Sequence, residues 1–270
     1  MPVGRGVAVG GVGGIGFLVI ALLYIFLGGD PAQLVEQMPE IGGPSSSVAV
    51  QPPPPGQDEL VDFVSVVLAD TEDTWSSVFA TIGRAYEEPR LVLFTGAVQS
   101  ACGMAGAAMG PFYCPADHKL YIDLSFYEEL QQRFRAPGDF AQAYVIAHEV
   151  GHHVQNLLGI NQEVTAMQRG ASSAEANALS VRLELQADCL AGIWAFNADR
   201  FRNLLEAGDI EEALNAASAI GDDRIQREAT GHVVPDSFTH GSSEQRVRWF
   251  RTGYETGDVA ACDTFRADQL

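Results

Sequence analysis

The sequence feature that most constrains the fold is the pentapeptide from His148 to His152, which reads His-Glu-Val-Gly-His. Its two histidines are four positions apart, so on a helix both imidazoles project from nearly the same face, one turn apart. Glu149 lies close to that face, where its carboxylate can take a proton from a metal-bound water. The alternative is a helix that carries two histidines by coincidence, but the chain has only six histidines, so such a coincidence is rare. The pattern therefore predicts a helix that carries half of a zinc site.

A catalytic zinc site needs a third protein ligand and an open fourth position. A second segment with helical spacing, residues 182–194, carries Glu184 and Asp188 one turn apart beside apolar residues. An unpaired carboxylate on a buried face is costly, and a metal ion offsets that cost. Glu184 would complete a two-histidine, one-glutamate set, and Asp188 would accept the outer N–H of a ligating histidine. A solvated helix face with local salt bridges is the alternative.

Five other residues could supply a ligand and are less suitable. His153 would project about 100° away from the metal face, and Cys189 is better explained by a disulfide. The full set of these alternatives is His118, His153, Cys189, His232 and His240.

The first 57 residues differ in composition from the rest of the chain. Residues 6–29 contain no charge and exceed the roughly 20 residues that cross a bilayer, which predicts a transmembrane signal anchor. Arg5 precedes this run and Asp30 follows it, so residues 1–5 would be cytoplasmic. A cleaved signal peptide is the alternative. Residues 30–57 are rich in Pro, Gly and Ser, which predicts an extended tether before a folded domain at residues 58–270.

Charge and cysteine content restrict partners and location. The formal net charge is −19, which would repel nucleic acid, so we expect no nucleic-acid partner. The four cysteines are Cys102, Cys114, Cys189 and Cys262, and none is spaced like a zinc-binding pair. The simplest pairing joins Cys102 to Cys114 and Cys189 to Cys262, which would suit an oxidising compartment outside the cytoplasm. Buried free thiols are the alternative.

Apolar spacing predicts a mainly helical α+β domain. Apolar residues from Leu60 to Tyr86 recur at helical spacing, giving one helix, or two with a break near Asp73, ended by Pro89. Residues 91–94 and 120–124 read as strands of a small sheet beside the helix with the histidine pair, and an exposed edge of this sheet could bind an extended peptide. Further helices are expected over 125–134, from an Asp139 cap to Gly159, over 182–194, over 210–220 and after Ser242 and Ser243, with residues up to about 180 partly helical and partly mobile.

Several motifs together resemble a known family. The chain has Glu-Leu-Gln-Ala-Asp-Cys at 184–189, Thr-His-Gly at 239–241, Gln-Arg-Val at 245–247 and Cys-Asp-Thr-Phe at 262–265. With the His-Glu-x-x-His motif and residues 110–115, these resemble the putative neutral zinc metallopeptidases of bacteria over nearly all of residues 58–265. The helix with Glu-x-x-x-Asp also resembles that of gluzincins. The resemblance implies a zincin-like catalytic domain behind a membrane segment and a low-complexity tether.

The resemblance also implies roles for two further residues. His240 would donate a hydrogen bond to the negatively charged reaction intermediate. Arg246 would be either a partner of Asp188 or a clamp for a substrate carboxylate. No substrate follows from the resemblance.

We therefore expect a single-pass membrane protein whose extracytoplasmic domain binds one Zn²⁺ per chain and hydrolyses peptide bonds, with Glu149 as general base. Its substrate would be a peptide or an unfolded protein. The alternative from another class is a zinc-stabilised module that binds peptides, or acts as a chaperone, without cutting them. Glu149 argues against this alternative, because a structural zinc site closes all four positions and needs no base.

Overall fold

The computed structural model of the protein describes residues 58–106 and 110–270. The segments 1–5, 6–29 and 30–57, predicted as cytoplasmic end, transmembrane anchor and tether, lie outside these ranges. Among the described helices, none combines the length and the apolar composition that crossing a bilayer requires. The described residues form a mainly helical α+β structure, as the apolar spacing predicted.

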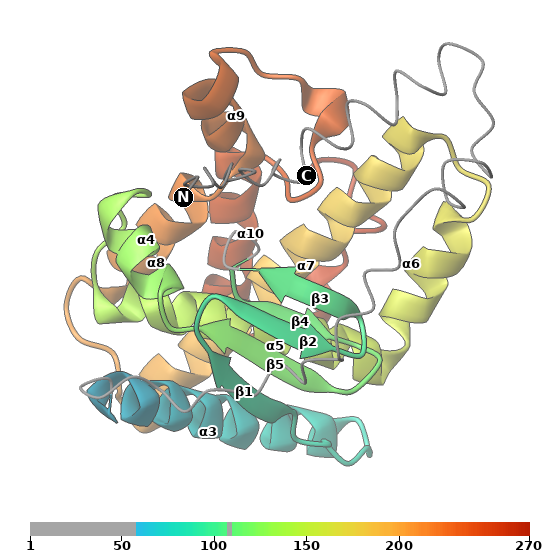
Figure 1. The fold of residues 1–270 in the computed structure, drawn as a ribbon. Helices are drawn as coiled ribbons and strands as arrows, with labels where there is room; N and C mark the ends of the chain where they lie inside the picture. The colour runs from blue at the N-terminus through green and yellow to red at the C-terminus, as the bar shows by residue number, and fades with distance from the viewer. Residues whose placement is uncertain (1–57, 107–109) are drawn as a thin grey trace, which may run out of the picture. The chain divides into compact units, whose positions relative to one another are not determined.

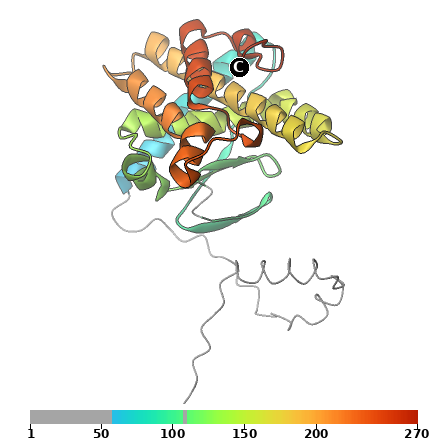
Figure 2. The ribbon, with the colours of Figure 1, turned by 90° about the horizontal axis from the view of Figure 1, so that it is seen from above.

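Figure 1 shows a small sheet with helices packed behind and beside it, and Figure 2 shows these helices gathered on one side of the strands. The elements in chain order are α3 (Asp58–Thr81), β1 (Arg90–Phe94), β2 (Ala97–Ser100), β3 (Gly103–Gly106), β4 (Phe112–Cys114), β5 (Lys119–Asp123), α4 (Phe126–Gln132), α5 (Asp139–Leu158), α6 (Ile160–Gln168), α7 (Ser173–Arg202), α8 (Asp209–Ala219), α9 (Asp222–Thr230), η2 (Pro235–Ser237), α10 (Ser243–Thr256) and η3 (Val259–Cys262).

Helix α3 is continuous and does not break near Asp73. Its buried residues, among them Val64, Leu68, Trp75 and Phe79, form one stripe at helical spacing that faces the core. Asp73 is exposed on the opposite face, where a charge does not disturb a helix. The helix ends at Thr81, well before Pro89.

The sheet has three strands in the order β1-β5-β4. β1 runs parallel to β5 and β4 runs antiparallel to it, and the predicted strands 91–94 and 120–124 correspond to β1 and β5. Side chains alternate across β5: Leu120 and Ile122 belong to the main core, whereas Tyr121 belongs to a smaller cluster with residues of the β2–β3 hairpin. Within the described residues β4 is an edge strand, because it pairs with β5 alone. The hairpin and β4 were not predicted, since they are short and carry little apolar periodicity.

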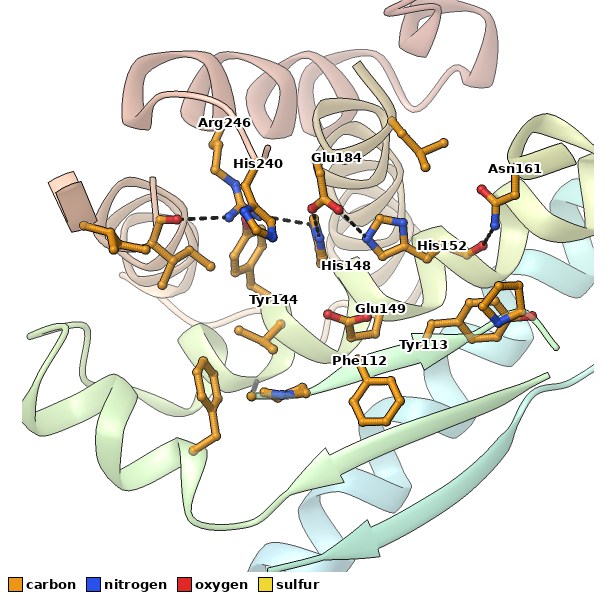
Figure 3. A pocket seen from close by; sticks show the side chains of 18 of the residues that line it. Phe112, Tyr113, Tyr144, His148, Glu149, His152, Asn161, Glu184, His240 and Arg246 are labelled. Carbon is orange, nitrogen blue, oxygen red and sulfur yellow. Dashed lines mark hydrogen bonds and ion pairs between the residues drawn. The ribbon is translucent and has the colours of Figure 1, made fainter. Parts of the chain in front are cut away.

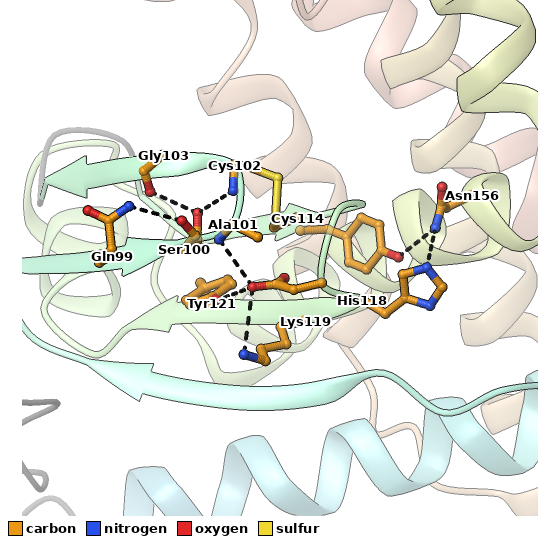
Figure 4. Close-up of a disulfide and its surroundings, with 12 residues drawn as sticks. Gln99, Ser100, Ala101, Cys102, Gly103, Cys114, His118, Lys119, Tyr121 and Asn156 are labelled. Atoms are coloured by element: carbon orange, nitrogen blue, oxygen red, sulfur yellow. Dashed lines mark hydrogen bonds and ion pairs between the residues drawn. A yellow bond between two sulfur atoms is a disulfide. The ribbon is translucent and has the colours of Figure 1, made fainter.

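Two disulfides connect distant segments. The Cys102–Cys114 bridge joins the hairpin turn to the end of β4 (Figure 4), and the Cys189–Cys262 bridge joins α7 to η3. Asp117 adds a second connection to the hairpin turn, because its carboxylate accepts a hydrogen bond from the backbone N–H of Ala101 at 3.3 Å. The pairing is the one that the sequence favoured.

Helix α5 is the central element, with most of its residues buried. The prediction that Asp139 caps it was wrong: the N-cap is Gly138, and a carboxylate from α8, that of Glu212, accepts the backbone N–H of Phe140 at 3.2 Å. The Glu212 carboxylate, brought from another helix, thus bonds to a backbone N–H of the first turn of α5, a role that was expected of the Asp139 side chain. The helix ends as predicted at Gly159, which adopts the left-handed conformation with φ 87°.

Helices α7 and α10 form the second half of the core. Each begins with a capping box, Ser172 with Glu175 and Ser242 with Gln245, so the expected serine cap of the last helix is confirmed. The segment up to residue 180 was expected to be partly helical, and it forms α6 and the first turns of α7, which begins after the Ser172 cap. Its expected mobility stays a prediction.

Candidate metal centre

The predicted ligand residues meet where α5 and α7 cross. His148 Nε2 lies 3.2 Å from one carboxylate oxygen of Glu184, and His152 Nε2 lies 3.5 Å from the other. One ligand atom from each of these three residues falls within 4.8 Å of the others. Figure 3 shows the two imidazoles side by side on α5, facing the Glu184 carboxylate from α7. The helical spacing of residues 148 and 152 produces this convergence.

The outer nitrogens of both histidines are held by acceptors. His148 Nδ1 lies 2.8 Å from the Asp188 carboxylate, and His152 Nδ1 lies 2.9 Å from Oε1 of Gln155. With Nδ1–H donating in each case, both Nε2 lone pairs point toward Glu184. Two neutral imidazole nitrogens and one carboxylate oxygen are the donor set of catalytic zinc sites, so these residues fit a zinc ion.

Asp188 is the hub of a buried network behind His148. Its side chain is fully buried and accepts hydrogen bonds from Arg246 Nε and Nη2, both at 2.9 Å, and from the Tyr144 hydroxyl at 2.5 Å. Burial alone would raise the pKa of Asp188, but Arg246 and His148 outweigh it and hold the pKa at about 2. Asp188 therefore stays ionised and holds the His148 ring in one orientation.

Of the two roles expected for Arg246, the structure supports partnership with Asp188. The Arg246 side chain is 3% exposed, and Nη1 also donates to the carbonyl oxygen of Ile220 at 3.3 Å. Because Nε, Nη1 and Nη2 each already donate to buried acceptors, the guanidinium is held in place as the partner of Asp188.

Glu149 lies beside the ligand group without joining it. Glu149 is only 8% exposed, and this burial raises the pKa of its carboxyl group, while His152 and His148 partly counteract the rise. The backbone of Tyr113 in β4 also lowers this pKa. A carboxylate with a raised pKa next to a metal centre can accept and return a proton near neutral pH.

His240 lies on a loop before α10 and lines the same cavity as the ligand group (Figure 3). Asp222, the first residue of α9, fixes this loop: one carboxylate oxygen accepts the backbone N–H groups of Thr239 and His240 at 2.7 Å each and of Gly241 at 3.1 Å. The other oxygen lies 3.3 Å from His240 Nδ1. The hydrogen bond to Asp222 raises the pKa of His240, which favours the protonated imidazole.

Three of these residues were missed by sequence reasoning. Tyr144 precedes His148 by four positions and Gln155 follows His152 by three, so helical spacing could have revealed both. Asp222 had no such signal, because it is 18 positions from His240 and only the folded loop joins them.

The remaining ligand candidates lie outside the group. His153 is buried and lies 3.0 Å from the Tyr113 hydroxyl and 2.6 Å from the Glu87 carbonyl oxygen. His118 lies 3.4 Å from a carboxylate oxygen of Glu87, His232 is exposed, and Cys189 is in a disulfide.

The metal centre opens into a cavity of about 600 Å³. Its walls come from the segment 110–115 containing β4, from α5 and α6, from Leu183 and Glu184 of α7, and from residues near α4, α8 and α9. His148, Glu149 and His152 lie midway along it, since α5 forms its floor from Tyr144 onward.

Comparison with known proteins gives consistent matches. Residues 2–265 match the family described as "Putative neutral zinc metallopeptidase". The uncharacterized protein YpfJ of Escherichia coli K12 is 51% identical over 255 residues, which cover 94% of this chain and 87% of YpfJ. The uncharacterized protein Rv2575 of Mycobacterium tuberculosis H37Rv is 44% identical over 218 residues, which cover 77% of this chain and 73% of Rv2575. No solved structure matches the chain.

Proposed function

The chain belongs to the putative neutral zinc metallopeptidase family, and on this premise we propose that it is a zinc-dependent endopeptidase with a zincin-like catalytic domain at residues 58–270. The observation that carries the proposal is the convergence of His148, His152 and Glu184 on one point, with Glu149 next to it and outside the ligand set. A purely structural metal site has no use for this base.

One zinc ion per chain, held by His148, His152 and Glu184, would acidify a water and polarise the scissile carbonyl group. Glu149 takes one proton from the attacking water as the oxygen of this water bonds to the carbonyl carbon. Glu149 then gives that proton to the amine nitrogen as the C–N bond breaks, so one water is consumed for each peptide bond cleaved. The raised pKa of Glu149 suits both transfers.

Two further residues would assist this reaction. His240, protonated and oriented by Asp222, donates a hydrogen bond to the carbonyl oxygen as negative charge develops there. Asp188 keeps the Nδ1–H of His148 in place, so that the imidazole offers Nε2 throughout.

The substrate would be an extended peptide or unfolded protein bound along β4. This strand lines the cavity and pairs with β5 on one side only, within the described residues. Its free edge offers backbone N–H and C=O groups to which an extended chain can add as a further strand. The peptide bond to be cut would then lie between β4 and the metal centre.

We further propose that the domain works outside the cytoplasm, attached to the membrane by residues 6–29 and spaced from it by residues 30–57. The two disulfides support an oxidising compartment. The net charge of −19 argues against a nucleic-acid partner.

The test compares metal content with cleavage of an unstructured protein, before and after chelation. Glu149→Gln should keep stoichiometric zinc and lose at least about a hundredfold in rate, whereas His148→Ala should lose both zinc and cleavage. Glu244→Gln, the same chemical change at a side chain that is 83% exposed, is the control and should match the wild type.

Stoichiometric zinc without hydrolysis by the wild type would favour the alternative, a zinc-stabilised module that binds peptides without cutting them. Retention of full activity by Glu149→Gln would exclude the mechanism proposed for Glu149.

A further inference from the structure

A closed ring of hydrogen-bonding side chains joins the last turns of α5 to β4. Its members are His153 and Asn156 of α5, Tyr113 of β4, His118 in the turn before β5 and Glu87 in the segment before β1. Figure 4 shows Asn156 bonded to His118 in this hydrogen-bond ring. None of the five belongs to the ligand group or takes part in the chemistry proposed above, so the hydrogen-bond ring needs an explanation of its own.

The direction of its bonds follows from the groups present. The Glu87 carbonyl oxygen only accepts, so His153 Nε2, 2.6 Å away, donates to it. Both nitrogens of this fully buried imidazole bond to uncharged groups, so the imidazole is neutral and Nδ1 accepts from the Tyr113 hydroxyl at 3.0 Å. The Tyr113 oxygen accepts from Asn156 Nδ2, also at 3.0 Å. Asn156 Nδ2 lies 3.3 Å from His118 Nε2, and His118 Nδ1 lies 3.4 Å from the Glu87 carboxylate, which closes the hydrogen-bond ring.

The hydrogen-bond ring is the polar connection between β4 and α5. The other attachments of β4 are its backbone pairing with β5 and the Cys102–Cys114 bridge to the hairpin turn, and both lie on the side of the sheet and its hairpin. Across the described residues, the hydrogen bonds between side chains of α5 and side chains of β4 both end on the Tyr113 hydroxyl, one at His153 and one at Asn156. This connection therefore passes through one oxygen atom.

The same tyrosine lies beside the proposed base. The backbone of Tyr113 is close enough to lower the pKa of the Glu149 carboxyl group. Figure 3 shows Glu149 between the metal ligands and residues Phe112 and Tyr113 of β4. Glu149 and His153 are four positions apart on α5 and so lie on one helix face. Tyr113 is thus anchored through its side chain one helical turn away from the residue that its backbone approaches.

Resting on the proposed peptidase function, we infer that His153 is a positioning residue of the active site. It accepts the hydrogen bond of the Tyr113 hydroxyl and donates to Glu87, and in this way it fixes β4 against α5. The Tyr113 backbone then holds the Glu149 carboxylate at the distance from the attacking water that proton transfer requires. Because catalysis depends steeply on this distance, a displaced base lowers kcat while the metal ligands stay in place. The two adjacent histidines have different tasks: His152 binds the metal, and His153 holds the strand.

Two replacements of His153 separate this role from general support of the fold. In His153→Asn the side-chain oxygen takes the place of Nδ1 and can keep the hydrogen bond of Tyr113. In His153→Gln the side-chain amide takes the place of Nε2 and can keep the bond to Glu87. Each variant loses the imidazole and one hydrogen bond, so a merely structural histidine predicts equal effects. We expect kcat within about threefold of the wild type for His153→Asn and about 10–100-fold lower for His153→Gln.

Two tyrosine variants complete the set. Tyr113→Phe removes only the hydroxyl oxygen and should reproduce the loss in kcat of His153→Gln, and the variant with both changes should be no slower than either alone. Tyr121→Phe is the matched control. Its hydroxyl bonds to Asp117 at 2.7 Å on the hairpin side of the sheet, so its loss removes one hydrogen bond without releasing β4 from α5, and kcat should not change.

The measurements use the zinc-loaded full chain in detergent, with dye-labelled casein as the unstructured substrate. Zinc affinity from competition with a chelator and KM should both stay within about threefold of the wild type in every variant, because the ligands and the cavity walls remain. The loss should therefore appear in kcat. If His153→Gln does not fold, Tyr113→Phe decides, since it deletes a single atom.

The outcomes separate this inference from the function on which it rests. Equal losses in His153→Asn and His153→Gln, a wild-type kcat in Tyr113→Phe, or a comparable loss in Tyr121→Phe would each overturn the positioning role and leave the peptidase function intact. Loss of zinc by Tyr113→Phe would also overturn it, because the hydrogen-bond ring would then support the ligands and not the base. No cleavage of casein by the zinc-loaded wild type would overturn both.

Discussion

Replacing Asp188 by asparagine tests whether the buried network behind His148 supports both the fold and the metal centre. The side chain is nearly isosteric but loses the charge that faces Arg246, which is only 3% exposed. Four hydrogen bonds end on this carboxylate, and an amide can accept those at one oxygen only. Its NH₂ group would then face another donor.

The expected loss is large because one partner of a buried ion pair remains without the other. Breaking such a pair typically costs about 3–5 kcal/mol. For a domain of this size, that corresponds to a fall in Tm of roughly 6–20 °C. Zinc affinity should fall by about 10–100-fold, because an outer-shell carboxylate no longer fixes the His148 ring.

Urea unfolding of the protein and competition with a chromophoric chelator measure these two effects. A double-mutant cycle with Arg246→Met is the control: removing both charges should destabilise the protein by less than the sum of the single changes, by about 1–3 kcal/mol. If Asp188→Asn lowers stability by less than about 1 kcal/mol and leaves zinc affinity within about threefold of the wild type, Asp188 is not the hub described above. Strict additivity in the cycle would also contradict this role.

Three further predictions address the loop, the core and the metal. Asp222→Asn should keep its zinc content and lower kcat/KM by about 10–100-fold. Because Asp222 raises the pKa of His240, the substitution should move the alkaline limb of the pH profile of kcat/KM to lower pH. An alkaline limb at the wild-type pH would contradict the role of this pair. Gly253→Ala should lower the free energy of unfolding in urea by about 3 kcal/mol, because the new Cβ would lie 1.9 Å from the Cys189 carbonyl oxygen. A loss under about 1 kcal/mol would mean that α7 and α10 separate easily. When free zinc is about 1,000-fold above its Kd, bound zinc should stabilise the protein by about 4 kcal/mol. Chelation should remove this stabilisation and lower the Tm of the wild type, whereas the Tm of His148→Ala should not change on chelation.

The helices of the site were predictable because their information is local. The pattern of apolar residues around His148 and around Glu184 repeats with the helical period, and a carboxylate on a buried stripe needs a partner. The positions at which the two helices face each other followed from these stripes. The disulfide pairing was the simplest of the three possible and is the one observed.

The features that were not predictable depend on tertiary contacts. Glu212 replaces Asp139 at the start of α5 because the fold brings α8 there, and no local pattern shows this. Asp222 reaches the His240 loop for the same reason. A break near Asp73 was one of two expectations, and the helix continues there because Asp73 lies on the exposed face of α3. Local propensity was overruled in these cases by surroundings that only the folded chain defines.

The separation of α5 and α7 determines the geometry of the centre, and two small residues determine that separation. A Cβ at Gly151 would lie 3.0 Å from the carbonyl oxygen of Ala187 and 3.1 Å from its Cα, so the two backbones are in contact at this point. Gly151 lies between His148 and His152 in sequence, and Ala187 lies between Glu184 and Asp188. A larger side chain at either position would move the helices apart, and with them the Glu184 carboxylate from the imidazoles it now meets at 3.2 and 3.5 Å. The glycine of the His-Glu-Val-Gly-His motif is therefore as specific a requirement of the site as the histidines, because its small size allows the third ligand to approach them.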